Sequence, residues 1–273
     1  PGKSPGNGLI GQAFVLEPLI YAADALERPE CLAVARDVHR AHRWQETQAA
    51  WHVLDPDGRD GPLNTTFNQQ LWFAAIASRL KDEELGRRAG VFLDAVVPGV
   101  ALYRDGVVYH DSFAYRALPP GGGSQLARLR YLKRRLVKWS HRRRQRQRSV
   151  GYHAFNLVPL AMLRAAYPAH SFWRGPRYRR LMDAACRPTF TRQLEDNPYA
   201  YPYNPVGYEL AYVEAVTGEQ QDADRQLQRQ LAHLQGPPAP AVTGAIDNPT
   251  ALARSYELAR LLDLALPAAG TTP

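Results

Sequence analysis

The sequence has few cysteines, no long apolar run and, over one long stretch, no acidic residue. Its two cysteines, Cys31 and Cys186, are too few for a disulfide scaffold, and no CxxC pair is present to bind a metal. No run of about 18 uncharged apolar residues exists, so the sequence offers no candidate for a membrane-spanning helix. It also lacks the GxGxxG, P-loop, GxSxG and HExxH motifs. We therefore expect neither a metal nor a cofactor.

Acidic residues are missing between Asp111 and Asp183, and half of the 34 lysines and arginines lie in that interval. The rest of the chain is mildly acidic, so the net charge of +8 belongs to one basic insert, residues 119–148. A local excess of this kind points to an anionic partner for the insert. The remaining composition, with 45% hydrophobic residues, is that of a globular chain, and we expect a single domain over residues 1–273.

Helical patterns dominate, and two types alternate along the chain. One type is apolar nearly all round, as expected of helices buried on several sides, and the other has one polar face. The apolar segments are Leu9–Leu26, Phe67–Leu80, His153–Tyr167, Val206–Val216 and Thr250–Leu266. The amphipathic segments are Glu30–Trp44, Lys81–Val97, Tyr178–Leu194 and Gln220–Leu234. This alternation predicts an all-α fold, an (α/α) toroid of about five to six helical hairpins in which the apolar helices form the inner ring.

Strand signals are local. The segment Ala101–Asp111 alternates around Asp105-Gly106 and predicts one small β-hairpin, whereas the turn-rich Trp51–Leu63 predicts a loop or a second small hairpin. In the basic insert, PPGGG at 119–123 predicts a hinge. Leucines and Trp139 recur at helical spacing among the arginines of 125–148, which predicts a cationic amphipathic helix. We expect its end, His141–Arg148, to be a frayed charged tail.

The candidate binding residues gather where the apolar helices begin. In a toroid these ends converge at one rim of the axial cavity, where amides and aromatic rings would suit a polyhydroxylated ligand. Asparagines there are also ordinary helix caps, as Asn204 before Pro205 would be. The predicted substrate-binding residues are Gln12, Asn68, Gln70, Trp72, Tyr109, His110, Tyr152, Tyr201, Tyr203, Asn204, Tyr208 and Asn248.

Proton-transfer candidates are the ionisable residues of the same region, Glu209, Asp247, His153 and Asp111. Glycoside cleavage normally uses two carboxyl groups that flank the bond. His153 lies within an apolar helix, where it is either a base or a satisfied core histidine. The tyrosine-rich segment 199–212 has two interpretations as well, a stacking wall for a sugar or a plug of the core.

Three starts of apolar helices, NGLIGQAF (7–14), TFNQQLWFAA (66–75) and YNPVGYELAYV (203–213), resemble inner-helix motifs of the six-hairpin toroid glycosidase-like superfamily. Within that superfamily the chain is most similar to the agl-cluster proteins found with glycan-assembly genes. It is more distantly similar to the unsaturated glucuronyl hydrolases. The resemblance covers most of the chain and implies an (α/α) toroid that handles a sugar or a glycan intermediate.

Together these patterns predict a carbohydrate-active enzyme that acts on a glycan or a uronate-containing sugar, free or lipid-linked, by carboxylate-based acid/base chemistry. Two alternatives stay open: a non-catalytic ligand- or membrane-binding toroid protein, and an isoprenoid cyclase-like enzyme, although its aspartate-rich acid motif is missing. Residues 125–148 either lie on an anionic membrane surface or pack their leucines on the toroid. We do not expect nucleic acid as a partner, because exposed aromatic residues are not interleaved with the arginines. Without a targeting signal we expect a cytoplasmic protein, peripheral to the membrane if the insert binds lipid.

Overall fold

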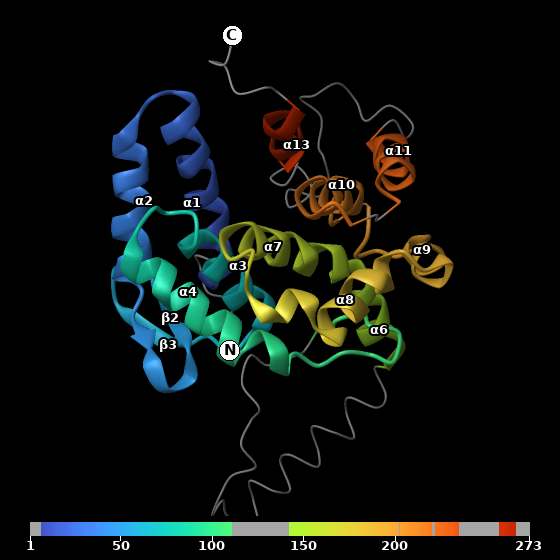
Figure 1. The fold of residues 1–273 in the computed structure, drawn as a ribbon, viewed down its shortest axis with the longest axis horizontal. Coiled ribbons are helices and arrows are strands. Elements are labelled where there is room, and N and C mark those ends of the chain that lie inside the picture. Colours follow the sequence, from blue (N-terminus) through green and yellow to red (C-terminus); the bar gives the residue numbers. More distant parts are fainter. Residues whose placement is uncertain (1–6, 111–141, 202, 220–221, 235–256, 266–273) are drawn as a thin grey trace, which may run out of the picture. The chain divides into compact units, whose positions relative to one another are not determined.

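The computed structural model describes residues 7–110, 142–201, 203–219, 222–234 and 257–265. These residues form two compact units, and the chain passes between them more than once, for example within helix α7. The described part of the first unit contains residues 7–101, 142 and 162–175, and that of the second contains 102–110, 143–161 and the described residues after 175. Both units are mostly helical (Figure 1). The expectation of a mostly helical protein is confirmed, and one small antiparallel sheet is present in addition.

The first unit is built from two pairs of helices. They are α1 (Gly8–Ala25), α2 (Pro29–Ala41), α3 (Phe67–Ala77) and α4 (Glu83–Ala95), with short 3-10 turns at η2 (Val97–Gly99) and η3 (Ser171–Arg174). Helix α1 packs against both α2 and α3, and α3 packs against α4. All residues of α3 except Asn68 and Gln69 are buried, whereas α4 buries only one face. The distinction between all-round apolar and amphipathic segments therefore corresponds to central and peripheral helices in this unit.

A three-stranded antiparallel sheet lies in the first unit between α2 and α3 in sequence. Its strands are β1 (Trp44–Gln45), β2 (Ala50–Leu54) and β3 (Asp60–Leu63), in the order β1-β2-β3, and η1 (Glu46–Gln48) joins the first two. Trp44 pairs with Trp51, and His52 pairs with Leu63. The turn-rich segment that begins at Trp51 is thus a hairpin rather than a loop.

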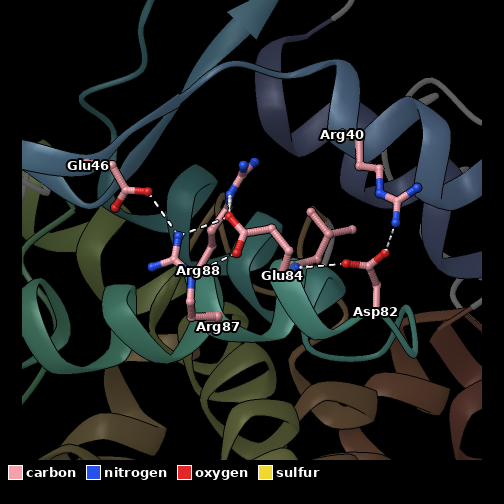
Figure 2. A network of polar contacts seen from close by, with 7 residues as sticks. Arg40, Glu46, Asp82, Glu84, Arg87 and Arg88 are labelled. Carbon is pink, nitrogen blue, oxygen red and sulfur yellow. Dashed lines mark hydrogen bonds and ion pairs between the residues drawn. The ribbon is translucent and has the colours of Figure 1, made fainter.

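An exposed polar network holds α4 in place (Figure 2). Asp82 caps the helix, because its Oδ1 accepts the Leu85 N–H at 3.0 Å, and it also pairs with Arg40 of α2. Arg87 donates to Glu84 at 2.7 Å and to Glu46 of η1 at 2.9 Å. Single exposed ion pairs contribute little stability, but this network links α4 to two other elements.

The second unit contains most of the remaining helices. They are α6 (Arg142–Gly151), α7 (His153–Ala166), α8 (Pro176–Ala185), α9 (Pro188–Leu194), α10 (Val206–Thr217), α11 (Ala223–Leu234) and α13 (Glu257–Ala265). Helix α10 packs against both α11 and α13, which makes it the central helix of this group (Figure 1). The hairpin expected at Ala101–Asp111 is reduced to a single bridge between Leu102 and Val108 around a tight turn.

Two predicted segments are corrected by the structure, and a third is described only in part. The expected frayed tail at His141–Arg148 is wrong, since α6 is a helix from Arg142 to Gly151. The single helix expected at Tyr178–Leu194 is also wrong. It is broken before Pro188, because proline lacks an N–H and disfavours helical geometry in the preceding residue. The last helix is described from Glu257, and the earlier part of Thr250–Leu266 lies outside the described residues.

Candidate functional site

The starts of α1 and α3 lie side by side in the first unit. Asn7 and Gly8 have positive φ values of 55° and 64°. A side chain on Gly8 would meet the Gln69 Oε1 atom at 2.7 Å, so glycine permits both the backbone conformation and the close approach. Gln69 also accepts a hydrogen bond from Asn64 Nδ2 at 2.7 Å. Amide side chains therefore surround this pair of helix starts.

Gln70, one of the predicted ligand-binding residues, is used within the fold. Its Oε1 accepts the Trp51 N–H at 3.0 Å, and its Nε2 donates to the carbonyls of Trp51 at 2.8 Å and Asn64 at 2.7 Å. The side chain is fully buried and joins β2 to the start of α3. Three satisfied hydrogen bonds leave it no evident role toward a ligand.

The other predicted residues of the first unit differ in how accessible they are. Trp72 is fully buried and contacts the edge of the Phe14 ring, with 5.4 Å between ring centroids. Gln12 and Asn68 are half-buried, on α1 and α3. The Oδ1 atom of Asn68 is shielded from solvent and has no hydrogen-bond partner within the described part of the chain. This oxygen therefore keeps an unused capacity to accept a hydrogen bond within the described structure.

A second pair of helix starts meets in the second unit. Gly151, at the junction of α6 and α7, lies so close to Tyr199 that a side chain there would come within 2.5 Å of the Tyr199 carbonyl oxygen. Asn204, just before α10, donates from Nδ2 to the carbonyls of Gly151 at 2.8 Å and Tyr199 at 2.7 Å. The predicted cap at Asn204 is wrong, because the residue that caps α10 is Pro205 and no side-chain hydrogen bond is made there. Asn204 instead ties the starts of α7 and α10 together.

Aromatic rings gather around Tyr152 at this junction. The Tyr152 ring lies 4.5 Å from the ring of His110, 6.0 Å from that of Tyr203 and 6.4 Å from that of Tyr199, measured between centroids. All four residues are half-buried. Tyr109, also half-buried, contacts Tyr103 at 5.3 Å. Four of the predicted substrate-binding residues, Tyr109, His110, Tyr152 and Tyr203, thus lie on neighbouring segments of the second unit.

Arginines of α6 border these rings. Arg144 donates from Nε to the Tyr199 hydroxyl at 3.3 Å, and the Arg148 guanidinium lies over the Tyr199 ring, 5.3 Å from its centroid. The hydrogen bond from Arg144 lowers the pKa of the Tyr199 phenol below its usual value, and the positive charge of Arg148 acts in the same direction. Arg146 points elsewhere, to Asp105, whose pKa it lowers although partial burial opposes the shift.

His153 is fully buried, and both of its ring nitrogens contact the backbone. Nδ1 accepts the Val108 N–H at 3.3 Å, and Nε2 donates to the Leu181 carbonyl at 3.0 Å. Burial lowers the pKa of His153 to about 4, so the ring is neutral at pH 7. This geometry is that of a satisfied core histidine, the alternative weighed for this residue in the sequence.

Of the predicted proton-transfer carboxylates, Glu209 is the one that the structure describes. It lies in the first turn of α10 between Tyr208 and Leu210, and it is fully buried. The other proposed proton-transfer carboxylates, Asp111 and Asp247, lie outside the described residues, as does Asn248.

The remaining predicted tyrosines belong to the core of the second unit. Tyr201 donates its hydroxyl proton to Gln226 of α11, and its ring stacks on His233 with 4.9 Å between centroids. Tyr208 is also buried. Burial raises the pKa of both phenols, so both remain protonated at neutral pH. Helix α11 thereby anchors the loop that carries Tyr199 and Tyr203.

Sequence reasoning missed the contribution of α6 to this junction. We define the α6–tyrosine cluster as Arg144, Arg148, Tyr152, Tyr199 and Tyr203. The sequence predicts a frayed tail for Arg144 and Arg148, because the segment His141–Arg148 has no apolar residues that would indicate helical periodicity. The arginines' spacing of four residues, which places side chains on one helix face, was the available signal. Within the described residues no three His, Cys, Asp or Glu side chains come together as a metal site would require.

Comparison with known proteins yields one informative relative. The chain is 33% identical to archaeal glycosylation protein Q of Haloferax volcanii over 277 aligned positions. The alignment covers 96% of this chain and 74% of the relative. No family model and no solved structure matches the chain.

Proposed function

The chain belongs to the family of archaeal glycosylation protein Q, and from this membership we propose that it takes part in glycan assembly as a carbohydrate-active enzyme. The observation that carries the proposal is the group of half-buried rings at the joined starts of α7 and α10. Flat aromatic faces cover the apolar face of a sugar ring, and partial exposure leaves them open to a ligand. The α6–tyrosine cluster together with Tyr109 and His110 would form this binding surface.

For the chemistry we propose a mechanism based on two carboxylates, Glu209 and Asp247. Glu209, buried in the first turn of α10, would donate the proton to the leaving group. A second carboxylate would then act as base or stabilise the positive charge that develops on the sugar. Asp111 is the alternative second acid. The backbone contacts of both His153 nitrogens speak for a supporting role of that residue.

The amides of the first unit support a polyhydroxylated substrate as well. Asn68 offers an unoccupied acceptor and Gln12 a half-buried amide, both near the start of an inner helix. We propose that the two units continue the same alternation of inner and outer helices as one (α/α) toroid over residues 1–273. The contacts of α1 with α3 and of α10 with α13 are those expected of neighbouring inner helices.

The proposed substrate is a glycan or a uronate-containing sugar, free or lipid-linked. None of the described helices combines the length and apolar character that a bilayer crossing would need. For a lipid-linked substrate we propose contact through residues 125–148, of which the structure describes 142–148 as part of α6. We propose a cytoplasmic protein that associates with an anionic membrane surface through this basic segment.

A non-catalytic glycan-binding protein is the second candidate function. It is favoured by the structural use of residues that were candidates for a site, since Gln70, Asn204 and His153 all hold backbone groups. Such a protein would keep the aromatic surface and need no acid. The two candidates differ in one measurable property, turnover.

The experiment compares wild type with Glu209→Gln and Asp247→Asn on uronate-terminated oligosaccharides, by chromatography of the products and by direct binding. The enzyme hypothesis predicts turnover in the wild type and its loss in both variants, with binding and melting temperature nearly unchanged. Glu214→Gln is the matched control on α10, because the amide retains an oxygen for the Ala223 N–H. Binding without turnover in the wild type would establish the second candidate, and full activity of both variants would exclude this mechanism.

A further inference from the structure

We propose that Arg144 and Arg148 of α6, together with the hydroxyl of Tyr199, form a binding site for a phosphoryl group carried by the ligand. The inference concerns a chemical group that the proposed function does not specify. Only the identification of the attached part as a sugar rests on that function.

The two arginines converge on one tyrosine. They are four residues apart, so their side chains leave the same face of α6. Arg144 reaches the hydroxyl at 3.3 Å, and Arg148 reaches the ring face at 5.3 Å from its centroid. Arg144 donates through Nε, which leaves its two terminal nitrogens for another acceptor.

Within the described residues, the charges of Arg144 and Arg148 are not paired with a carboxylate. Arg146, between the two, is neutralised by Asp105 and also donates to Gln193. In the described parts of the chain no carboxylate lies within ion-pair distance of Arg144 or Arg148. Glu195 is engaged by Arg229. The rings of Tyr152 and Tyr203 also lie near Tyr199, with 6.4 Å between centroids in each case.

The composition of the site favours a dianion over a single carboxylate. Two guanidinium groups supply two positive charges, and the Tyr199 hydroxyl supplies a further hydrogen bond. A phosphate monoester carries a charge between about −1.5 and −2 at pH 7 and offers three acceptor oxygens. Arginines bind such groups through charge-assisted, often bidentate, hydrogen bonds. The rings of Tyr152 and Tyr203, 6.0 Å apart, lie beside the site and would accommodate a sugar attached to the phosphoryl group.

Two sources could supply this group, a sugar phosphate or the headgroup of a phospholipid. Calorimetric titrations of the full chain with inorganic phosphate, glucose 1-phosphate, glucose and glucuronate test the site. Vesicles with and without phosphatidylglycerol test the lipid source. The decisive variant is the double substitution Arg144→Gln/Arg148→Gln. Its matched control is Arg179→Gln/Arg192→Gln, which removes the same charge from exposed positions of the same unit.

We expect glucose 1-phosphate to bind more tightly than glucuronate or glucose, and the α6 double variant to weaken this binding at least tenfold while the control does not. Weakening of vesicle binding alone would assign the same site to a lipid headgroup. The proposal is overturned if every phosphoryl probe and vesicle binds the α6 variant as it binds wild type, or if glucuronate binds most tightly. Tyr199→Phe, which keeps the ring, should weaken binding less than the double variant. If glucose 1-phosphate binds no more tightly than inorganic phosphate, the proposed sugar-binding surface is refuted. The proposed phosphoryl site is not affected by that result.

Discussion

Acid should destabilise both units because each contains a fully buried neutral histidine. His39 of α2 stacks on Phe73 with 3.9 Å between centroids and donates from Nε2 to the Phe73 carbonyl at 3.1 Å. Its Nδ1 has no hydrogen-bond partner in the described structure, so a proton there would be buried and unpaired. Burial lowers the pKa of His39 to about 3, and that of His153 in the second unit to about 4.

The pKa shifts fix the direction and size of the effect. Both folded-state pKa values lie below the value of 6.5 expected for an unfolded chain, so only the unfolded state takes up protons as the pH falls below 6.5. Stability is therefore fully present above that pH and declines as the pH approaches the folded-state values. At about 1.4 kcal/mol per pH unit, each histidine should cost roughly 2.5 kcal/mol at pH 4.5. Together they would remove about 5 kcal/mol, a large part of the roughly 5–15 kcal/mol typical of a folded domain.

Urea unfolding between pH 7.5 and 4.5 measures this loss, with tryptophan fluorescence to report on the first unit and circular dichroism on both. His39→Gln keeps a donor for the Phe73 carbonyl but cannot titrate. Its free energy of unfolding should fall by about 2.5 kcal/mol less than that of wild type over this range. Phe92→Leu, a core variant without a titratable group, should retain the wild-type slope. An unchanged slope in His39→Gln would refute the argument that burial holds this histidine neutral.

Two further substitutions test the contacts at the helix starts. Gln70→Leu leaves the backbone groups of Trp51 without partners and should lower the free energy of unfolding by about 3 kcal/mol in urea titrations, whereas the exposed Gln48→Leu should change it by less than about 0.5 kcal/mol. Gly151→Ala places a methyl group against the Tyr199 loop and should cost about 2 kcal/mol by the same assay; a cost no larger than that of Gly99→Ala, which meets open space, would contradict the close approach.

Helices could be predicted from the sequence where it carries an apolar pattern. The prediction failed where no such pattern is present. The predicted Leu9–Leu26 and Phe67–Leu80 agree with α1 and α3 within three residues at each end, because both segments are rich in apolar residues. Only α3 is buried nearly all round, whereas α1 buries mainly one face. Helix α6 is polar along most of its length, and contacts with residues about 40 to 55 positions away hold it. No local pattern contains that information.

The residues predicted for the site also fall into two groups in the structure. The rule that site residues lie at the starts of apolar helices selected Tyr152 and Tyr203, which the structure brings together with His110 of the predicted hairpin. The same rule selected Gln70 and Asn204, whose amides are hydrogen-bonded to backbone groups distant in sequence. A sequence shows that a buried amide needs a partner, but the identity of the partner is decided by tertiary packing.

The two kinds of polar residue at these helix starts are complementary rather than competing. An aromatic surface binds a sugar well only if its rings are held in place beforehand, since ordering them on binding costs entropy. Asn204 holds the Tyr199 carbonyl and Gln226 holds the Tyr201 hydroxyl, and both residues are buried. The half-buried rings of Tyr199 and Tyr203 lie beside these fixed points. Amides that bind the backbone therefore serve the proposed function indirectly, by fixing the rings and arginines that would meet the ligand.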